Sequence, residues 1–150
     1  MIRAVFDTNL LVSSFLTRNS PGGVTTELLR FAIRRKIELH LSPAIIEEVL
    51  ETLTRNPRAQ ANYRYTPQMA EQYCSDLLDV ATIIHDPPPT PGAVPRDPDD
   101  DKIVACAVAA GVPYIVSRDR DLLSLGSYGE IEILPPEVFI HLVRNQPQGP

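Results

Sequence analysis

The sequence lacks any apolar run long enough to span a membrane, and its three histidines are isolated from one another. No apolar segment approaches the roughly 18 residues that a membrane-spanning helix needs. The opening segment, Met1 to Phe6, has the pattern of a strand, and Asp7 interrupts it too early for a secretion signal. His40, His85 and His141 show no metal-ligand spacing. These absences argue against a membrane protein and against a histidine-based metal centre.

Cysteine is also scarce, with only Cys74 and Cys106 in 150 residues. Both lie in apolar helical contexts and are far apart in the sequence. We expect two buried free thiols, which is typical of the reducing cytoplasm; a disulfide or a shared metal is the less favoured alternative. The sequence therefore predicts a cytoplasmic location.

Positive charge is in short supply. The chain carries 14 Lys and Arg against 19 Asp and Glu, for a formal net charge of −5. A protein that grips nucleic acid through bulk charge is normally basic, so this balance disfavours that class. The acids gather near predicted strand ends, whereas basic residues concentrate in segments 30–36 and 55–64. An acidic pocket rimmed by basic patches remains compatible with a cation and a phosphate-bearing substrate.

The length and the 43% apolar content predict one domain with a core of its own, covering residues 1–145, followed by a flexible tail at 146–150. The proline-rich segment 85–98 is expected to be an extended linker, and segment 56–65 a loop or broken helix. Apolar runs predict strands at 2–6, 81–84 and 113–116, alternation of apolar and polar residues predicts one at 37–41, and a last strand is expected at 131–134. Periodicity predicts helices at 10–16, 24–36, 44–53, 68–80, 103–110 and 137–144. This alternation predicts a three-layer α/β/α fold with a central, mainly parallel sheet of Rossmann-like topology, in which 131–134 is an edge strand.

Acidic side chains recur at the expected ends of strands and starts of helices. Each has an ordinary explanation: Asp7 and Asp101 can cap helices, Asp119 can belong to a turn, and Glu48 can be an exposed helical glutamate. In a parallel sheet, however, residues that follow strands meet at one edge, where ligand sites form. Clustered carboxylates repel one another unless a cation joins them. Oxygen ligands alone favour Mg²⁺ or Mn²⁺, which can activate water for phosphodiester hydrolysis.

The ordered set of motifs resembles the PIN-domain family, in particular the VapC-like toxin ribonucleases of bacterial toxin–antitoxin pairs. The matching pieces cover nearly the whole chain. They are the first strand ending in Asp7-Thr8-Asn9, Ser42 followed six positions later by Glu48, Asp101-Lys102 before a small-residue helix, and Ser117-Arg118-Asp119-Arg120-Asp121 after a strand. The long proline-rich segment before Arg96 departs from the more compact members.

The resemblance implies Mg²⁺- or Mn²⁺-dependent cleavage of RNA, a homodimer and silencing by a cognate antitoxin. It implies that four acids hold the metal, that Asp121 assists, and that Asn9 and Ser117 orient the site through hydrogen bonds. The four acids are Asp7, Glu48, Asp101 and Asp119. Two assignments stay open, because Glu47 adjoins Glu48, and Asp99 and Asp100 adjoin Asp101; spacing favours Glu48 and Asp101.

Other functions fit less well. A phosphatase of the haloacid dehalogenase type needs a second aspartate two residues after Asp7, where this chain has Asn9. A phosphoacceptor receiver domain needs an acidic pair and a later lysine that are not evident. A catalytically silent PIN-like module that binds RNA or protein is the main alternative, and the presence of all four acids counts against it.

Overall fold

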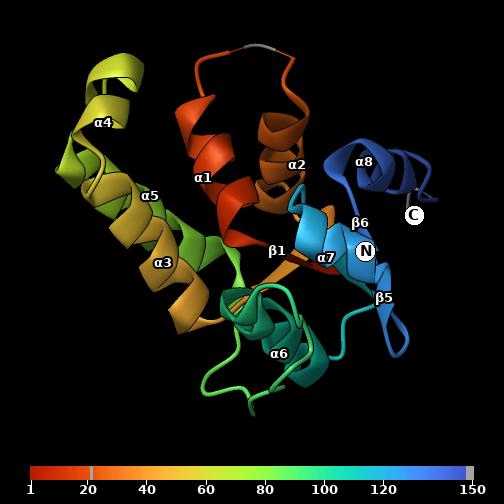
Figure 1. Cartoon of the computed structure of the whole chain (residues 1–150). Coiled ribbons are helices and arrows are strands. Elements are labelled where there is room, and N and C mark those ends of the chain that lie inside the picture. The colour runs from red at the N-terminus through yellow and green to blue at the C-terminus, as the bar shows by residue number, and fades with distance from the viewer. Residues whose placement is uncertain (21, 148–150) are drawn as a thin grey trace.

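The computed structural model of the protein describes residues 1–20 and 22–147, and in this part of the chain a six-stranded sheet forms the central layer (Figure 1). The strand order is β3-β2-β1-β4-β6-β5. Neighbours pair in parallel except for β5, which pairs antiparallel with β6. The strands are β1 (Ile2–Phe6), β2 (Ile37–Leu41), β3 (Thr82–Ile83), β4 (Tyr114–Val116), β5 (Ser127–Tyr128) and β6 (Ile131–Leu134).

The central strands are apolar because helices cover both of their faces. In β1, Ala4, Val5 and Phe6 are all buried, which gives the continuous apolar run typical of a parallel strand. Its register aligns Val5 with His40 of β2 and with Ile115 of β4. This register brings the carboxyl ends of β1, β2 and β4 to the same edge of the sheet.

Helices pack on both faces and beside one end of the sheet. In Figure 1, α1, α2 and α8 lie above the sheet and α6 lies below it, while α3, α4 and α5 extend to the side near β3. Helix α6 contacts β1, β2 and β4, and α3 packs against α1 and α5. The helices are α1 (Thr8–Leu16), α2 (Val24–Ile33), α3 (Pro43–Thr54), α4 (Pro57–Tyr63), α5 (Pro67–Val80), α6 (Asp101–Ala110), α7 (Arg120–Leu125) and α8 (Pro136–Arg144), and a 3₁₀ turn, η1 (Pro98–Asp100), precedes α6.

Local sequence fixes where these helices begin and end. The Ile45 N–H donates to Ser42 Oγ at the start of α3, over 3.4 Å, and Met69 N–H donates to Thr66 Oγ1 at the start of α5, over 3.2 Å. A proline follows each of these caps, where the missing N–H costs nothing. Gly111 ends α6 with a φ of +67°, a conformation that favours glycine.

The predicted three-layer α/β/α architecture is confirmed; two details of the prediction are wrong, and the two alternatives left open for 56–65 resolve to a short separate helix. The segment 131–134 is not an edge strand, because β5 pairs along its outer side. Residues 57–63 form helix α4, and Asn56 caps it by accepting from the Ala59 N–H over 3.0 Å. The linker ends before Pro98, where η1 begins.

The cysteines, the absence of a membrane span and the limits of the domain are also predicted from the sequence. Both cysteines are free and buried, as expected. Within the described ranges, no helix combines the length and hydrophobicity needed to cross a membrane. The domain limits at 1–145 stay a prediction. Of the tail, Gln146 Nε2 donates to the Lys36 carbonyl over 3.4 Å, and residues 148–150 lie outside the described residues.

Candidate metal centre

The carboxyl edge of the sheet positions the first acidic side chain. Asp7 directly follows β1, and its N–H donates to the Val116 carbonyl of β4 over 3.2 Å. Ser117, the next residue after β4, donates through its N–H to the Leu134 carbonyl over 3.0 Å. The two adjacent strand ends are therefore held together, and their following residues share the edge where ligands bind in parallel sheets.

Asp7 is 3% exposed and is fixed by two hydrogen bonds. Its Oδ1 accepts from the Leu10 N–H over 2.8 Å and so caps α1, while its Oδ2 accepts from Ser117 Oγ. Burial raises the pKa of Asp7 to about 6, with smaller additions from the charges of Asp119 and Glu48, and the two hydrogen bonds oppose the rise. The carboxylate is thus both a helix cap and part of a group of repelling charges.

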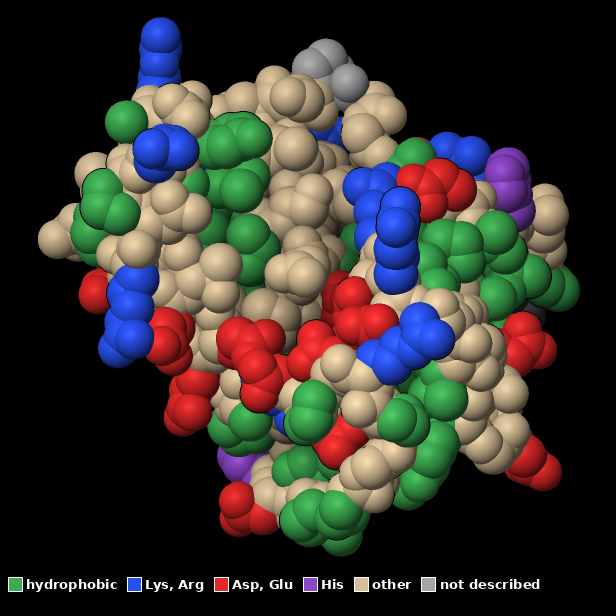
Figure 2. Space-filling view, viewed as in Figure 1, with side chains coloured by type: hydrophobic (Ala, Val, Ile, Leu, Met, Phe, Trp, Pro, Cys, Tyr) green, Lys and Arg blue, Asp and Glu red, His purple; other side chains and the backbone are tan. Residues whose placement is uncertain are grey.

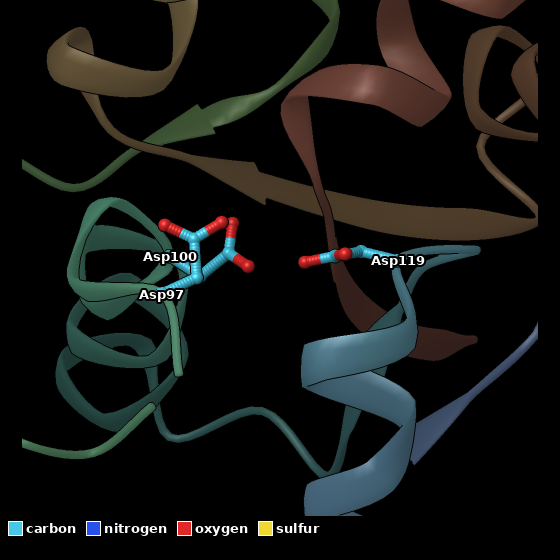
Figure 3. Close-up of side chains that lie close together, drawn as sticks. All are labelled: Asp97, Asp100 and Asp119. Atoms are coloured by element: carbon cyan, nitrogen blue, oxygen red, sulfur yellow. The ribbon is translucent and has the colours of Figure 1, made fainter. Parts of the chain in front are cut away.

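Three carboxylates converge beside Asp7. Oxygens of Asp97, Asp100 and Asp119 all lie within 4.8 Å of one another, and all three side chains are partly buried. Figure 3 shows Asp97 and Asp100 facing Asp119 across the space between η1 and α7. Asp97 caps η1 and Asp119 caps α7, so each carboxylate is held by the start of a helical segment.

Asp100 has the features expected of a metal ligand. Its Oδ2 is buried, and among the residues that the structure describes no N–H or hydroxyl group donates to it. Burial raises the pKa of Asp100 well above its usual range, and Asp119, Asp97 and Asp7 add to this rise. A buried carboxylate oxygen without a partner is costly. A hard cation would satisfy it, and the all-oxygen donor set suits Mg²⁺ or Mn²⁺.

Asp101, the residue favoured from spacing, points elsewhere. Its Oδ1 accepts from the Val94 N–H over 2.8 Å and its Oδ2 accepts from the Gly92 N–H over 3.1 Å. Thr90 Oγ1 also donates to the Asp101 carbonyl, over 3.2 Å. Asp101 thus anchors the proline-rich segment, whereas its neighbour Asp100 faces Asp119, and the role of Asp101 as a ligand stays a prediction that this geometry does not favour.

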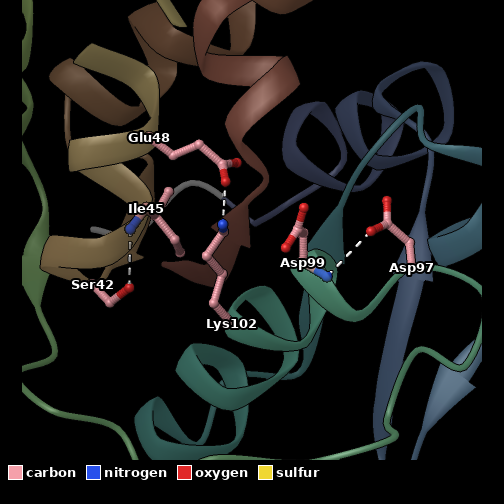
Figure 4. A network of polar contacts seen from close by, with 6 residues as sticks. All are labelled: Ser42, Ile45, Glu48, Asp97, Asp99 and Lys102. Carbon is pink, nitrogen blue, oxygen red and sulfur yellow. Dashed lines mark hydrogen bonds and ion pairs between the residues drawn. The ribbon is translucent and has the colours of Figure 1, made fainter. Parts of the chain in front are cut away.

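Glu48 lies on α3 at the other side of the group. It is partly buried and its charge acts on Asp7, whereas Glu47 is exposed, so the structure favours Glu48 over its neighbour. The Glu48 carboxylate forms an ion pair with Lys102 at the start of α6 (Figure 4). Figure 4 also shows Ser42 capping α3.

The supporting residues of the prediction have different surroundings. Ser117 is fully buried, and its Oγ donates to Asp7 and accepts from the Asp119 N–H over 2.9 Å, so it links two acids. Asp121 lies in the first turn of α7, where its N–H contacts Asp119 Oδ1 over 3.5 Å. Asn9 is exposed on α1, and no hydrogen bond of its side chain occurs within the described part of the chain. Its orienting role therefore stays a prediction.

Asp97 reaches the group of three, although no site role is predicted for it from the sequence. The pattern Asp97-Pro98 is a signal for a helical start, because aspartate favours the capping position and proline the first position inside. The density of prolines before it instead favoured an extended linker. In the structure the side chain of Asp97 accepts from the Asp99 N–H over 3.1 Å and reaches the group of three.

The three acids are partly buried, so the group is not enclosed by the core. Figure 2 shows acidic side chains gathered across the middle of one face of the molecule, with basic side chains around them. One neighbouring arginine, Arg118, is paired with Glu137 of α8, with Nε donating to Oε1 over 3.0 Å. Two surface hollows of about 510 and 560 Å³ are lined by other residues, among them Met1 and Arg35 in the first and Arg3 and Tyr128 in the second.

Comparisons with known proteins agree with this architecture. The sequence model described as "PIN domain" matches residues 3–121. Comparison with curated proteins gives no match. Among solved structures, PAE2754 from Pyrobaculum aerophilum is similar with a TM-score of 0.59 and 17% identity, covering 97% of this chain and 91% of that one. VapBC2 from Rickettsia felis, bound to a DNA fragment from its promoter, is similar with a TM-score of 0.59 and 11% identity, covering 89% and 98%. At these identities the likeness is one of fold.

Proposed function

The chain belongs to the PIN-domain family, and we propose that it is an Mg²⁺- or Mn²⁺-dependent endoribonuclease. The observation that carries the proposal is the buried, unpartnered Oδ2 of Asp100 beside the carboxylates of Asp97 and Asp119, as found among the described residues. A fold that keeps such a group must offset the repulsion, and a divalent cation does so directly.

Six acids would serve the metal. Asp97, Asp100 and Asp119 would hold it, and Asp7 and Glu48, which lie beside them, would join as further ligands. When bound, Mg²⁺ or Mn²⁺ supplies a water of lowered pKa and positive charge against the phosphate, which is the chemistry of phosphodiester hydrolysis. Asp121 would assist from the first turn of α7.

The other residues of the chain orient these acids. Ser117 Oγ holds the Asp7 carboxylate and, by accepting from the Asp119 N–H, fixes the start of α7. Asp101 holds the segment that leads to Asp97 and Asp100. A group of partly buried acids at the edge of the sheet suits a polymer better than a small molecule, which would need an enclosing pocket.

We extend the proposal to the toxin component of a toxin–antitoxin pair that acts in the cytoplasm. Its partners would be RNA as substrate, a cognate antitoxin and a second copy of the chain. The fold likeness to VapBC2 supports the antitoxin. The two buried free thiols support a reducing compartment.

The test is cleavage of a labelled circular single-stranded RNA by the purified protein, with Mn²⁺ or Mg²⁺ compared with EDTA. A circle has no ends, so any product comes from internal cutting. Asp119→Asn should abolish metal-dependent cleavage. The matched control is Asp99→Asn, which makes the same chemical change at an exposed acid two residues from Asp97.

The proposal would be supported if wild type and Asp99→Asn cleave the RNA with metal, and if cleavage is lost in Asp119→Asn and when EDTA is added. Cleavage that persists in EDTA, or in Asp119→Asn, would contradict the metal site. Binding of Mn²⁺ without cleavage of any RNA would favour the catalytically silent module instead.

A further inference from the structure

Lys102 places a positive charge against Glu48, the carboxylate that α3 contributes beside the candidate metal centre. It follows Asp100 and Asp101 at the start of α6, and its Nζ pairs with Glu48 Oε2 on α3 (Figure 4). The two side chains are 27% and 37% exposed, so the pair is neither fully solvated nor sealed. Because α3 follows β2 and α6 precedes β4, the ion pair joins two sides of the candidate metal centre.

The other ion pairs in the described ranges do not involve these acids. Arginine–glutamate pairs join Arg55 to Glu51, Arg118 to Glu137 and Arg144 to Glu27. Lys102 is therefore the cation that the structure sets directly against a carboxylate of the centre. While its ammonium holds Oε2, that oxygen is not free to bind a metal ion or a metal-bound water.

We propose that Lys102 is a displaceable internal cation, which competes with the metal for Glu48 and, once displaced, binds a phosphate of the RNA. An ammonium on a flexible four-carbon stem can change partners without a backbone movement, and lysine binds phosphate as a point charge. The exchange leaves Glu48 with a cation in both states. The competition for Glu48 is inferred from the Lys102–Glu48 ion pair alone. The contact with phosphate rests on the proposed function, because it requires RNA as the substrate.

The first experiment is calorimetric titration with Mn²⁺ alone, without RNA. Lys102→Met should bind Mn²⁺ about tenfold more tightly than wild type, because one positive charge leaves a partly exposed site. The matched control is Arg120→Met, which removes one positive charge beside Asp119 from an exposed side chain. At about 0.5 M salt, screening should erase the effect of Arg120→Met but leave most of the effect of Lys102→Met.

A double-mutant cycle separates competition from a general charge effect. In a Glu48→Gln background, Lys102→Met should no longer tighten Mn²⁺ binding, because the shared carboxylate is gone. The proposal would be overturned if Lys102→Met tightened Mn²⁺ binding equally in the wild-type and Glu48→Gln backgrounds, or if it tightened binding in neither. Where Lys102→Met fails to fold, as judged by circular dichroism in EDTA, Lys102→Gln takes its place in the cycle.

The second experiment measures RNA cleavage at saturating Mn²⁺. Lys102→Met should cleave at least about tenfold more slowly although it binds the metal more tightly, because it lacks a charged contact to phosphate. Lys102→Arg should recover part of the cleavage rate. If Lys102→Met cleaves RNA as fast as wild type, the proposed phosphate contact is overturned. If wild type itself fails to cleave, the proposed function fails, and the calorimetric cycle still decides the competition.

Discussion

Replacing Asp7 by asparagine should stabilise the metal-free protein at neutral and higher pH. The substitution keeps the shape of the side chain and an oxygen to accept from the Leu10 N–H, but it removes a negative charge that is 3% exposed. A carboxyl whose pKa is raised in the folded state binds its proton more tightly there than in the unfolded chain. The free energy of unfolding therefore falls as the pH rises between the two pKa values, and it stays lower above the folded one.

The magnitude follows from the rise of the Asp7 pKa from 3.8 to about 6. Because each tenfold change in proton binding is worth about 1.4 kcal/mol, ionised Asp7 costs the fold about 3 kcal/mol. Asp7→Asn escapes this cost above about pH 6 and gains little below about pH 4. For a protein of this size, the gain corresponds to a rise in Tm of roughly 6–12 °C at the higher pH.

The assay is urea unfolding followed by circular dichroism in EDTA, at several values between about pH 4.5 and about pH 8. Asp79→Asn, an exposed acid on α5, is the control and should change the free energy of unfolding by less than about 0.5 kcal/mol. Saturating Mn²⁺ should stabilise wild type and so reduce the difference in free energy of unfolding between wild type and Asp7→Asn. A loss of stability in Asp7→Asn that is the same at both ends of the pH range would refute the reasoning.

Three further variants test the surroundings of the site, each by urea unfolding. Asp101→Ala removes the acceptor of the Gly92 and Val94 N–H groups and should lower the free energy of unfolding by about 2 kcal/mol. It should also speed proteolysis within 85–97, and unchanged proteolysis would contradict the anchoring role. Gly111→Ala should cost about 1 kcal/mol from its φ of +67°, since no atom lies within 4 Å of the added Cβ, and a gain in stability would be the contrary result. Tyr73→Phe loses the 2.7 Å hydrogen bond from its hydroxyl to the Leu11 carbonyl and should cost about 1 kcal/mol, whereas unchanged stability would show that this link between α5 and α1 is dispensable.

The sequence predicts the layers of this fold because its parallel strands are buried. Ile2–Phe6 is a short, mostly apolar run and Ile37–Leu41 alternates apolar and polar residues, and the order of such segments and helices along the chain predicts a parallel sheet. The strand Ser127–Tyr128 has only two residues, too few to show a periodic pattern, so the sequence predicts Ile131–Leu134 as the edge strand. Helix α4 is largely polar and exposed, so hydrophobic periodicity does not reveal it, although Asn56-Pro57 is a start signal.

The sequence predicts at which edge of the sheet the candidate site lies, but it does not predict which of the neighbouring acids belong to it. Asp7 and Asp119 follow strands, so the topology alone brings them together. Asp100 and Asp101 lie where η1 passes into α6, and one step along a helix turns a side chain by about 100°, since a turn takes about 3.6 residues. Which of the two faces Asp119 depends on where the helix begins. That in turn depends on tertiary contacts of the proline-rich segment with Asp101.

The most direct measurement is anomalous X-ray diffraction from crystals of the wild-type protein grown with Mn²⁺, with Asp100→Asn crystals as the comparison. The account predicts an anomalous peak within bonding distance of carboxylate oxygens of Asp100 and Asp119 in wild type, and a weak or absent peak in the variant. A peak beside Asp101, or equal occupancy in the two proteins, would contradict the assignment of the metal centre.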